Sequence, residues 1–183
     1  TENKLGQKLE FLLKDDEIEA TLHYQFYRDI SVVRSWTVVK NVSNANVGLD
    51  YVSSFSLTGI EEDTADADLR VLIPHNYWLR EANWKCSTLS QLGLNRADGF
   101  SMKRIACSNI GTWSTKEYLP MGCLLNADKK TALLWQIESN SSWSWEISDS
   151  RSYLYLRLSG PSHLYNDWYH EIAPGETFES VKA

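Results

Sequence analysis

Much of the chain alternates apolar and polar residues, which predicts β-strands because successive side chains of a strand point to opposite faces. In residues 17–27, E-I-E-A-T-L-H-Y-Q-F-Y, every second residue is apolar, as expected of a half-buried strand. Alternation or runs of β-branched residues predict further strands at residues 31–42, 49–57, 132–138, 143–148, 153–159 and 177–181. We interpret the first third of the chain as an antiparallel meander, and residues 132–148 as a hairpin that turns at S-N-S-S.

No segment predicts a helix of ordinary length, although residues 87–94 can form one short helical turn that ends at Gly93. Residues 95–120 are rich in Ser, Gly and Asn without a period and predict long loops across the end of a sheet. The pattern therefore predicts an all-β class, an antiparallel β-sandwich with long loops. We expect residues 1–183 to form a single domain.

Residues 73–84, I-P-H-N-Y-W-L-R-E-A-N-W, break the alternation and predict a loop. Trp78 and Trp84 lie there beside the charged pair Arg80 and Glu81. Aromatic rings can stack on the C–H faces of a sugar, and a guanidinium and a carboxylate can bind its hydroxyls. The segment is therefore either a sugar-contacting loop or an aromatic loop folded onto its own sheet.

Composition narrows the possible partners of this domain. A net charge of −6 over 183 residues argues against nucleic acid and anionic lipid, which both need clustered Lys and Arg. No run of about 18 apolar residues predicts a membrane span. Three widely spaced cysteines and the lack of a basic, apolar leader indicate a reducing compartment, the cytoplasm, and the opening T-E-N-K suggests a fragment of a longer chain.

The titratable residues do not predict a metal site or a cofactor. The four histidines are scattered, and the acidic stretch at residues 61–68 lacks the glycine and terminal glutamate of a helix-loop-helix calcium site. Glu138 and Glu146 would face each other across the predicted hairpin, as a glycosidase acid and base must across a sugar. Solvated edge positions are the alternative for this pair.

Two further sugar-related hypotheses come from the same stretches. Trp143 and Trp145 share one face of a strand and form either core or a stacking platform, which a free-standing carbohydrate-binding module would use. A mutarotase needs a histidine acid and a carboxylate base, for which His75 and Glu171 are candidates.

Several short motifs resemble the N-terminal β-supersandwich domain of glycoside hydrolase family 36, the α-galactosidases and their relatives. Trp78-Leu79-Arg80-Glu81 is similar to the W-x-R-E stretch of that family. The S-x-x-G-x-x-S pattern at residues 108–114, the L-P-M at 119–121 and the ending A-P-G-E-T-F-E-S at 173–180 are similar to later segments. The similarity covers most of the chain.

The resemblance implies a galactose-mutarotase-like supersandwich with no catalytic residue, no cofactor and no metal. In the family, the catalytic aspartates lie in a (β/α)8 barrel that follows this domain. In several family members this domain packs beside the barrel and, in tetramers, lends loop residues to the rim of a neighbouring subunit's active site, so the resemblance implies a supporting domain of a homo-oligomer beside a galactoside subsite. Carried onto this sequence, that substrate-binding role falls on Trp78, Arg80, Glu81 and Trp84.

Overall fold

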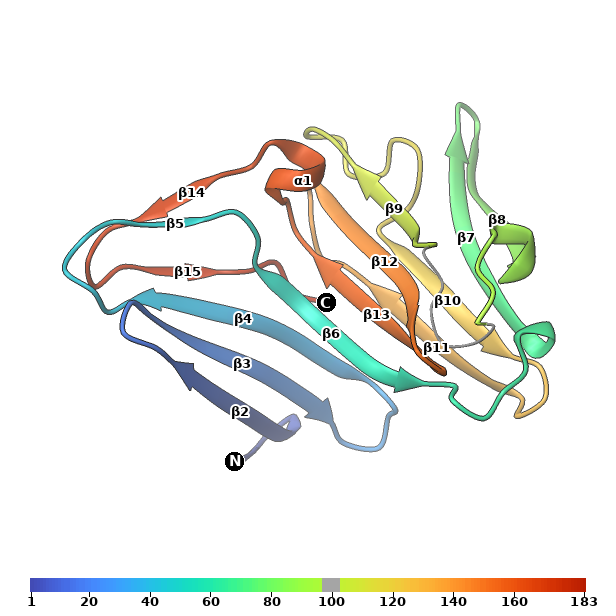
Figure 1. Cartoon of the computed structure of the whole chain (residues 1–183), viewed down its shortest axis with the longest axis horizontal. Helices are drawn as coiled ribbons and strands as arrows, with labels where there is room; N and C mark the ends of the chain where they lie inside the picture. The colour runs from blue at the N-terminus through green and yellow to red at the C-terminus, as the bar shows by residue number, and fades with distance from the viewer. Residues whose placement is uncertain (97–102) are drawn as a thin grey trace.

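The computed structural model describes residues 1–96 and 103–183, and the regular structure within them is almost entirely β (Figure 1). The helical segments of this part of the chain are single turns: η1 (Asp66–Asp68), η2 (Ser90–Leu92) and α1 (His163–Asn166). None of its helices is long and apolar enough to cross a membrane. The prediction of an all-β antiparallel sandwich is confirmed.

The first part of the chain builds a sheet that we call the N-terminal sheet. Its turn between the second and third strands is fixed by the Asp15 carboxylate, which accepts the backbone N–H groups of Glu17 and Ile18 at 2.8 Å each. The strand order is β1-β2-β3-β4-β15, and all pairs are antiparallel. The strands are β1 (Glu2–Asn3), β2 (Gly6–Lys14), β3 (Ile18–Tyr27), β4 (Val33–Asn41) and β15 (Thr177–Glu179).

A second sheet, which we call the central sheet, lies beside the first, with β6 next to β4 (Figure 1). The hydroxyls of Ser35 and Thr37 on β4 join the two sheets by donating to the carbonyls of Ser54 and Ser53, at 2.7 Å each. The strand order is β6-β13-β12-β9. The strands are β6 (Ser53–Ile60), β13 (Tyr153–Ser159), β12 (Trp143–Ser150) and β9 (Ile105–Asn109).

A third sheet, the distal sheet, covers one face of the central sheet in the order β11-β10-β7-β8. Its strands are β11 (Thr131–Gln136), β10 (Met121–Asn126), β7 (Leu69–Tyr77) and β8 (Arg80–Thr88). A small two-stranded sheet, β5 (Val47–Leu49) with β14 (His170–Ile172), lies at the far end of the molecule from β7 and β8 (Figure 1).

The main hydrophobic core lies between the central and distal sheets. Trp143, Trp145 and Ile147 alternate along β12 and are almost fully buried, with Leu154 and Leu156 of β13 beside them. The Trp145 ring meets that of Trp135 on the distal sheet edge-on, with centroids 5.2 Å apart. Large aromatic side chains contribute most of the buried area in such a core. Trp143 and Trp145 therefore hold the two sheets together, and the hypothesis of a stacking platform is wrong.

Residues 73–84 are not a loop, because they form a β-hairpin of β7 and β8. Val71 and Ile73 face the core, while Trp84, opposite Pro74, faces outward and is 41% exposed. The prediction was wrong because apolar residues occupy both faces here, so the contrast between a buried and a solvated face is missing from the sequence.

The predicted hairpin at residues 132–148 is also wrong. β11 belongs to the distal sheet and β12 to the central sheet, so residues 137–142 cross from one sheet to the other. Similarly, β6 leaves the predicted N-terminal meander and pairs with β13. Within residues 95–120, which were predicted as loops, Ile105–Asn109 form β9; residues 97–102 of that segment lie outside the described residues.

Other elements lie where the pattern predicts them. β3, β13 and β15 occupy the expected segments. The short helical turn is η2, and Gly93 ends it with a φ of 81°, a left-handed conformation that glycine adopts without a steric penalty.

Candidate functional site

The hairpin of β7 and β8 projects from one end of the distal sheet and carries the predicted substrate-binding residues (Figure 1). Tyr77 pairs with Arg80, so Trp78 and Leu79 form the connection at the hairpin tip. Their side chains are 85% and 80% exposed. Two large apolar side chains therefore stand in solvent at the tip, a costly arrangement for an isolated domain.

Asn76 fixes the conformation of this tip. Its side-chain oxygen accepts the backbone N–H of Ala82 at 2.8 Å, and its side-chain nitrogen donates to the carbonyl of Thr115 at 2.6 Å. The Asn76 backbone N–H also donates to the carbonyl of Glu117 at 2.8 Å. The tip is therefore tied both to itself and to the neighbouring 110–118 segment.

Two non-glycine residues at the tip have a left-handed backbone. Leu79 has a φ of 63° and Ala82 a φ of 53°, on either side of Arg80 and Glu81. Each such conformation costs on the order of 1–3 kcal/mol for an ordinary residue and persists only where the surroundings hold it. Asn76 supplies that support for Ala82, and the resulting bulge between His75 and Tyr77 sets the course of the chain through Arg80 and Glu81.

Arg80 and Glu81 are both exposed, and no ion pair joins them within the described residues. Trp84 lies four residues further along β8 on the outward face of the sheet. The structure thus places Trp78, Arg80 and Glu81 at one tip, with Trp84 lower on the same hairpin. Their proposed contact with substrate stays a prediction.

The carboxylates that were considered as a glycosidase pair are not a pair. Glu138 forms a bidentate interaction with Arg34 of the N-terminal sheet. Glu146 lies on the outward face of the central sheet, opposite Arg157 and Ala106 on its neighbouring strands. The hypothesis fails because β11 and β12 belong to different sheets.

The mutarotase pair fails for a similar reason. His75 lies on β7 and packs edge-on against Tyr118, with ring centroids 4.9 Å apart. Glu171 lies on β14, at the opposite end of the molecule (Figure 1), where its carboxylate accepts the side-chain N–H of Asn46 at 2.8 Å. The two groups cannot act on one sugar.

The acidic stretch at residues 61–68 makes ion pairs with basic residues from later in the chain. Asp66 lies 2.6 Å from the buried guanidinium of Arg96, and Glu61 lies 3.0 Å from the ammonium of Lys129. Although burial raises the pKa of Glu61, hydrogen bonds from Lys129, Thr64 and Asn126 bring it below the usual value. In the described part of the chain, no three metal-ligating side chains gather at one place.

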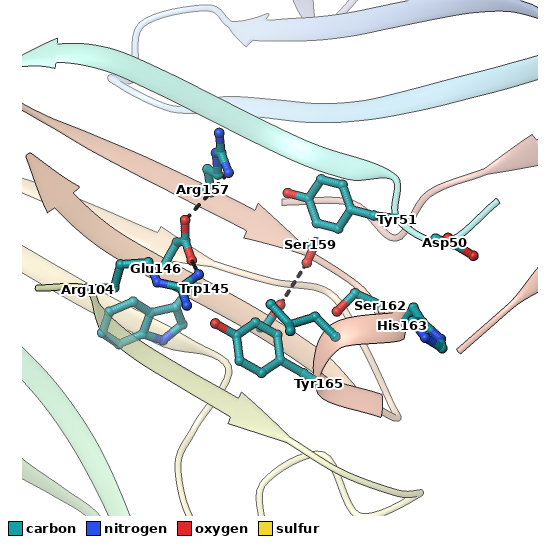
Figure 2. A pocket seen from close by; sticks show the side chains of 12 residues that line it. Asp50, Tyr51, Arg104, Trp145, Glu146, Arg157, Ser159, Ser162, His163 and Tyr165 are labelled. Carbon is teal, nitrogen blue, oxygen red and sulfur yellow. Dashed lines mark hydrogen bonds and ion pairs between the residues drawn. The ribbon is translucent and has the colours of Figure 1, made fainter. Parts of the chain in front are cut away.

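A pocket of about 370 Å³ lies on the outward face of the central sheet, and the sequence interpretation did not find it (Figure 2). Its floor is the hydroxyl pair of Ser144 and Ser159, 2.9 Å apart. Glu146 stands at one end, and Ser162 with α1 at the other (Figure 2). The signal was present in β12, where the polar residues Ser144, Glu146 and Ser148 alternate with the buried ones, but the other walls come from distant segments.

Comparison with solved structures assigns this fold to a class found in α-galactosidases. The galactosidase domain of an α-galactosidase–sucrose kinase, AgaSK, matches with a TM-score of 0.77 at 18% identity, over 96% of this chain and 23% of its own. A variant of the glycoside hydrolase family 36 α-galactosidase AgaA from Geobacillus stearothermophilus, in complex with stachyose, also matches with a TM-score of 0.77 at 18% identity, over 96% of this chain and 23% of its own. The α-galactosidase from Lactobacillus brevis matches with a TM-score of 0.71 at 14% identity, over 90% of this chain and 20% of its own.

No protein-family profile matches the sequence, and neither does any curated protein. The predicted resemblance to the N-terminal domain of family 36 α-galactosidases is confirmed at the level of fold. The chain spans 23% of the length of the first of these solved chains, so the comparison covers one domain of a much larger protein.

Proposed function

We propose that residues 1–183 form a non-catalytic accessory domain of an α-galactosidase-like glycoside hydrolase, whose catalytic barrel removes terminal α-galactosides. The observation that carries the proposal is a fold match with a TM-score of 0.77 over 96% of this chain. The matched chains are α-galactosidases, and this chain covers 23% of their length. The catalytic barrel belongs to the same chain or to a neighbouring one, and the domain supports it.

Apolar surface left in solvent supports a packing role. On β2, the side chains of Leu9, Phe11 and Leu13 share one face and are 47%, 54% and 60% exposed. A row of this kind is unfavourable in an isolated domain, and burial contributes about 25 cal/mol per Å² of apolar surface. A catalytic domain or a second subunit of a homo-oligomer would cover such a surface.

The hairpin tip is the part of the domain that we assign to the substrate side. Trp78 would form a wall of the galactoside subsite, while Arg80 and Glu81 would bind hydroxyls or partner groups and Trp84 would extend the apolar contact. The support is the exposure of Trp78 together with a backbone that Asn76 holds in a strained conformation. Such strain is maintained where a site needs a fixed shape.

We assign this enzyme to the cytoplasm. Cys86, Cys107 and Cys123 are free thiols, and burial, with a smaller contribution from the Glu117 charge, raises the pKa of Cys107 to about 12. Free thiols are kept in that state by a reducing compartment.

Replacing Trp78 with Ala in the complete enzyme tests the assignment of the tip. Loss of one aromatic contact of about 1.5 kcal/mol should lower kcat/KM for an aryl α-galactoside about tenfold, since 1.4 kcal/mol is a factor of ten. Ile30→Ala removes an exposed apolar side chain from the β3–β4 turn and is the matched control. Unchanged kinetics and unchanged assembly of Trp78→Ala would remove the proposed role.

A further inference from the structure

The pocket on the outward face of the central sheet combines features that a structural role does not explain. It has a volume of about 370 Å³, inside the range of about 300–1,000 Å³ that is usual for ligand sites. Its lining comes from the β5–β6 connection, the segment before β9, β12, β13 and the segment that leads into α1 and includes it (Figure 2). These segments are far apart in sequence, so the fold itself assembles the cavity.

One end of the pocket holds a buried carboxylate. Glu146 is 8% exposed and accepts a hydrogen bond from the Tyr155 hydroxyl at 3.1 Å. Arg104 and Arg157 approach its two oxygens at 3.4 and 3.6 Å. A buried carboxylate is costly unless it is paired, and these distances leave donor and acceptor capacity for further hydrogen bonds.

The opposite end holds an unpartnered hydroxyl. Ser162 is 3% exposed, and its Oγ has no hydrogen-bond partner among the described residues. Ser162 precedes α1, yet its side chain makes no capping bond, and its backbone N–H donates to the side-chain oxygen of Asn166. A buried hydroxyl without a partner is unfavourable, and a hydroxyl of a bound ligand would supply the missing hydrogen bond.

Two tyrosines stand over the floor between these ends. Tyr51, 46% exposed, comes from the segment before β6, and Tyr165 comes from α1; Figure 2 shows them on either side of the Ser144–Ser159 hydroxyl pair. The floor is polar and the walls are aromatic. A pyranose ring has matching surfaces, because its apolar C–H faces can stack on the aromatic walls and the hydroxyls on its edge can bind the polar floor.

From these observations, we propose that the pocket binds one neutral, hydroxyl-rich ring, such as a monosaccharide or the terminal residue of a glycan. Glu146 and the two arginines would bind adjacent hydroxyls, Ser162 would bind a hydroxyl at the other end, and Tyr51 would stack on the ring. A neutral ligand fits better than an anion because the two guanidinium groups of these arginines are balanced by the two carboxylates in the lining, Glu146 and Asp50. This site is separate from the hairpin tip, which lies on the distal sheet (Figure 1).

Isothermal titration calorimetry of the 183-residue chain with methyl α-galactoside, methyl α-glucoside and galacturonate tests the proposal. We expect a neutral glycoside to bind with a dissociation constant on the order of 1 mM, as few hydrogen bonds and one stacking contact allow. Ser162→Ala and Tyr51→Ala should each weaken binding about tenfold, and Glu146→Gln should weaken it further. Ile30→Ala, on the β3–β4 turn and outside the lining of this pocket, is the control and should bind like the unchanged chain.

Each outcome decides the question. If neither neutral glycoside binds, if galacturonate alone binds, or if Ser162→Ala and Tyr51→Ala bind as the unchanged chain does, the proposal is wrong. Loss of binding in Trp78→Ala would place the sugar at the tip instead and equally overturn it. Tyr51 is half exposed, so its variant keeps the test valid even where Glu146→Gln fails to fold. The kinetic test of the accessory role uses the catalytic domain and is independent of this result.

Discussion

The hairpin tip should lose its fixed shape when Asn76 is replaced with Ala. The change removes the hydrogen bond from the Ala82 N–H at 2.8 Å and the one to the Thr115 carbonyl at 2.6 Å. It leaves the β7 backbone intact, including the bond from the Asn76 N–H to Glu117. The perturbation is therefore confined to the support of the tip.

The expected magnitude follows from these two bonds. Each contributes about 1 kcal/mol net, so their loss amounts to about 2 kcal/mol. Ala82, freed from its φ of 53°, recovers part of a backbone cost of about 1–3 kcal/mol. The net destabilisation is then about 1–2 kcal/mol, which corresponds to a fall in Tm of roughly 2–8 °C for a chain of this size.

Hydrogen exchange at the Ala82 amide is the sharpest assay, because this N–H donates to the side chain that is removed. Protection should fall about tenfold or more, since 1.4 kcal/mol is a factor of ten. Asn76→Asp keeps the acceptor but loses the donor to Thr115, so it should preserve Ala82 protection better than Asn76→Ala. Asn83→Ala, one residue after Ala82, is the matched control. Unchanged Ala82 protection in Asn76→Ala would refute the assignment of Asn76 as the support.

Two further predictions concern the core and the acidic stretch. Trp145→Ala should destabilise the chain by about 3–5 kcal/mol in urea denaturation, because it removes the ring that packs on Trp135; a change under about 1 kcal/mol would contradict a core role. Because the pKa of folded Glu61 is lowered, its contribution to stability is present above the usual value of 4.5 and is lost as pH falls through the lower, folded-state pKa. Glu61→Gln should therefore flatten the acid limb of a stability–pH curve, whereas an unchanged limb would show that Glu61 does not contribute to it.

Local patterns predicted the strands that have one buried and one solvated face. β3 and β13 lie where alternation places them, since burial of every second residue is a property of the strand itself. Sheet membership is different, because it depends on which distant strand supplies the partner. Residues 132–148 alternate as a hairpin would, yet β11 and β12 are in different sheets, because their partners are strands from elsewhere in the chain.

The candidate sites also divide into features that neighbouring residues predict and features that only the tertiary structure creates. Trp78, Arg80 and Glu81 could be found from sequence because they are consecutive, and the structure puts them together at the hairpin tip. The strand conformation of Arg80 and Glu81 was missed because apolar residues occupy both faces of this hairpin, with Trp84 on the outward face. The pocket could not be predicted, since its aromatic wall residues join the floor of β12 only through tertiary structure.

The alternation of β12 links the core to the pocket. Trp143, Trp145 and Ile147 face the distal sheet, and Ser144, Glu146 and Ser148 necessarily face the other way. Indole rings packed in a core have little freedom, so Trp143 and Trp145 fix the backbone of β12 between them. That fixed backbone positions the Ser144 and Glu146 side chains on the outward face. A domain that served only as packing material would gain nothing from a buried carboxylate and an unpartnered hydroxyl on that outward face. Their presence is therefore better explained by a ligand that this face binds directly.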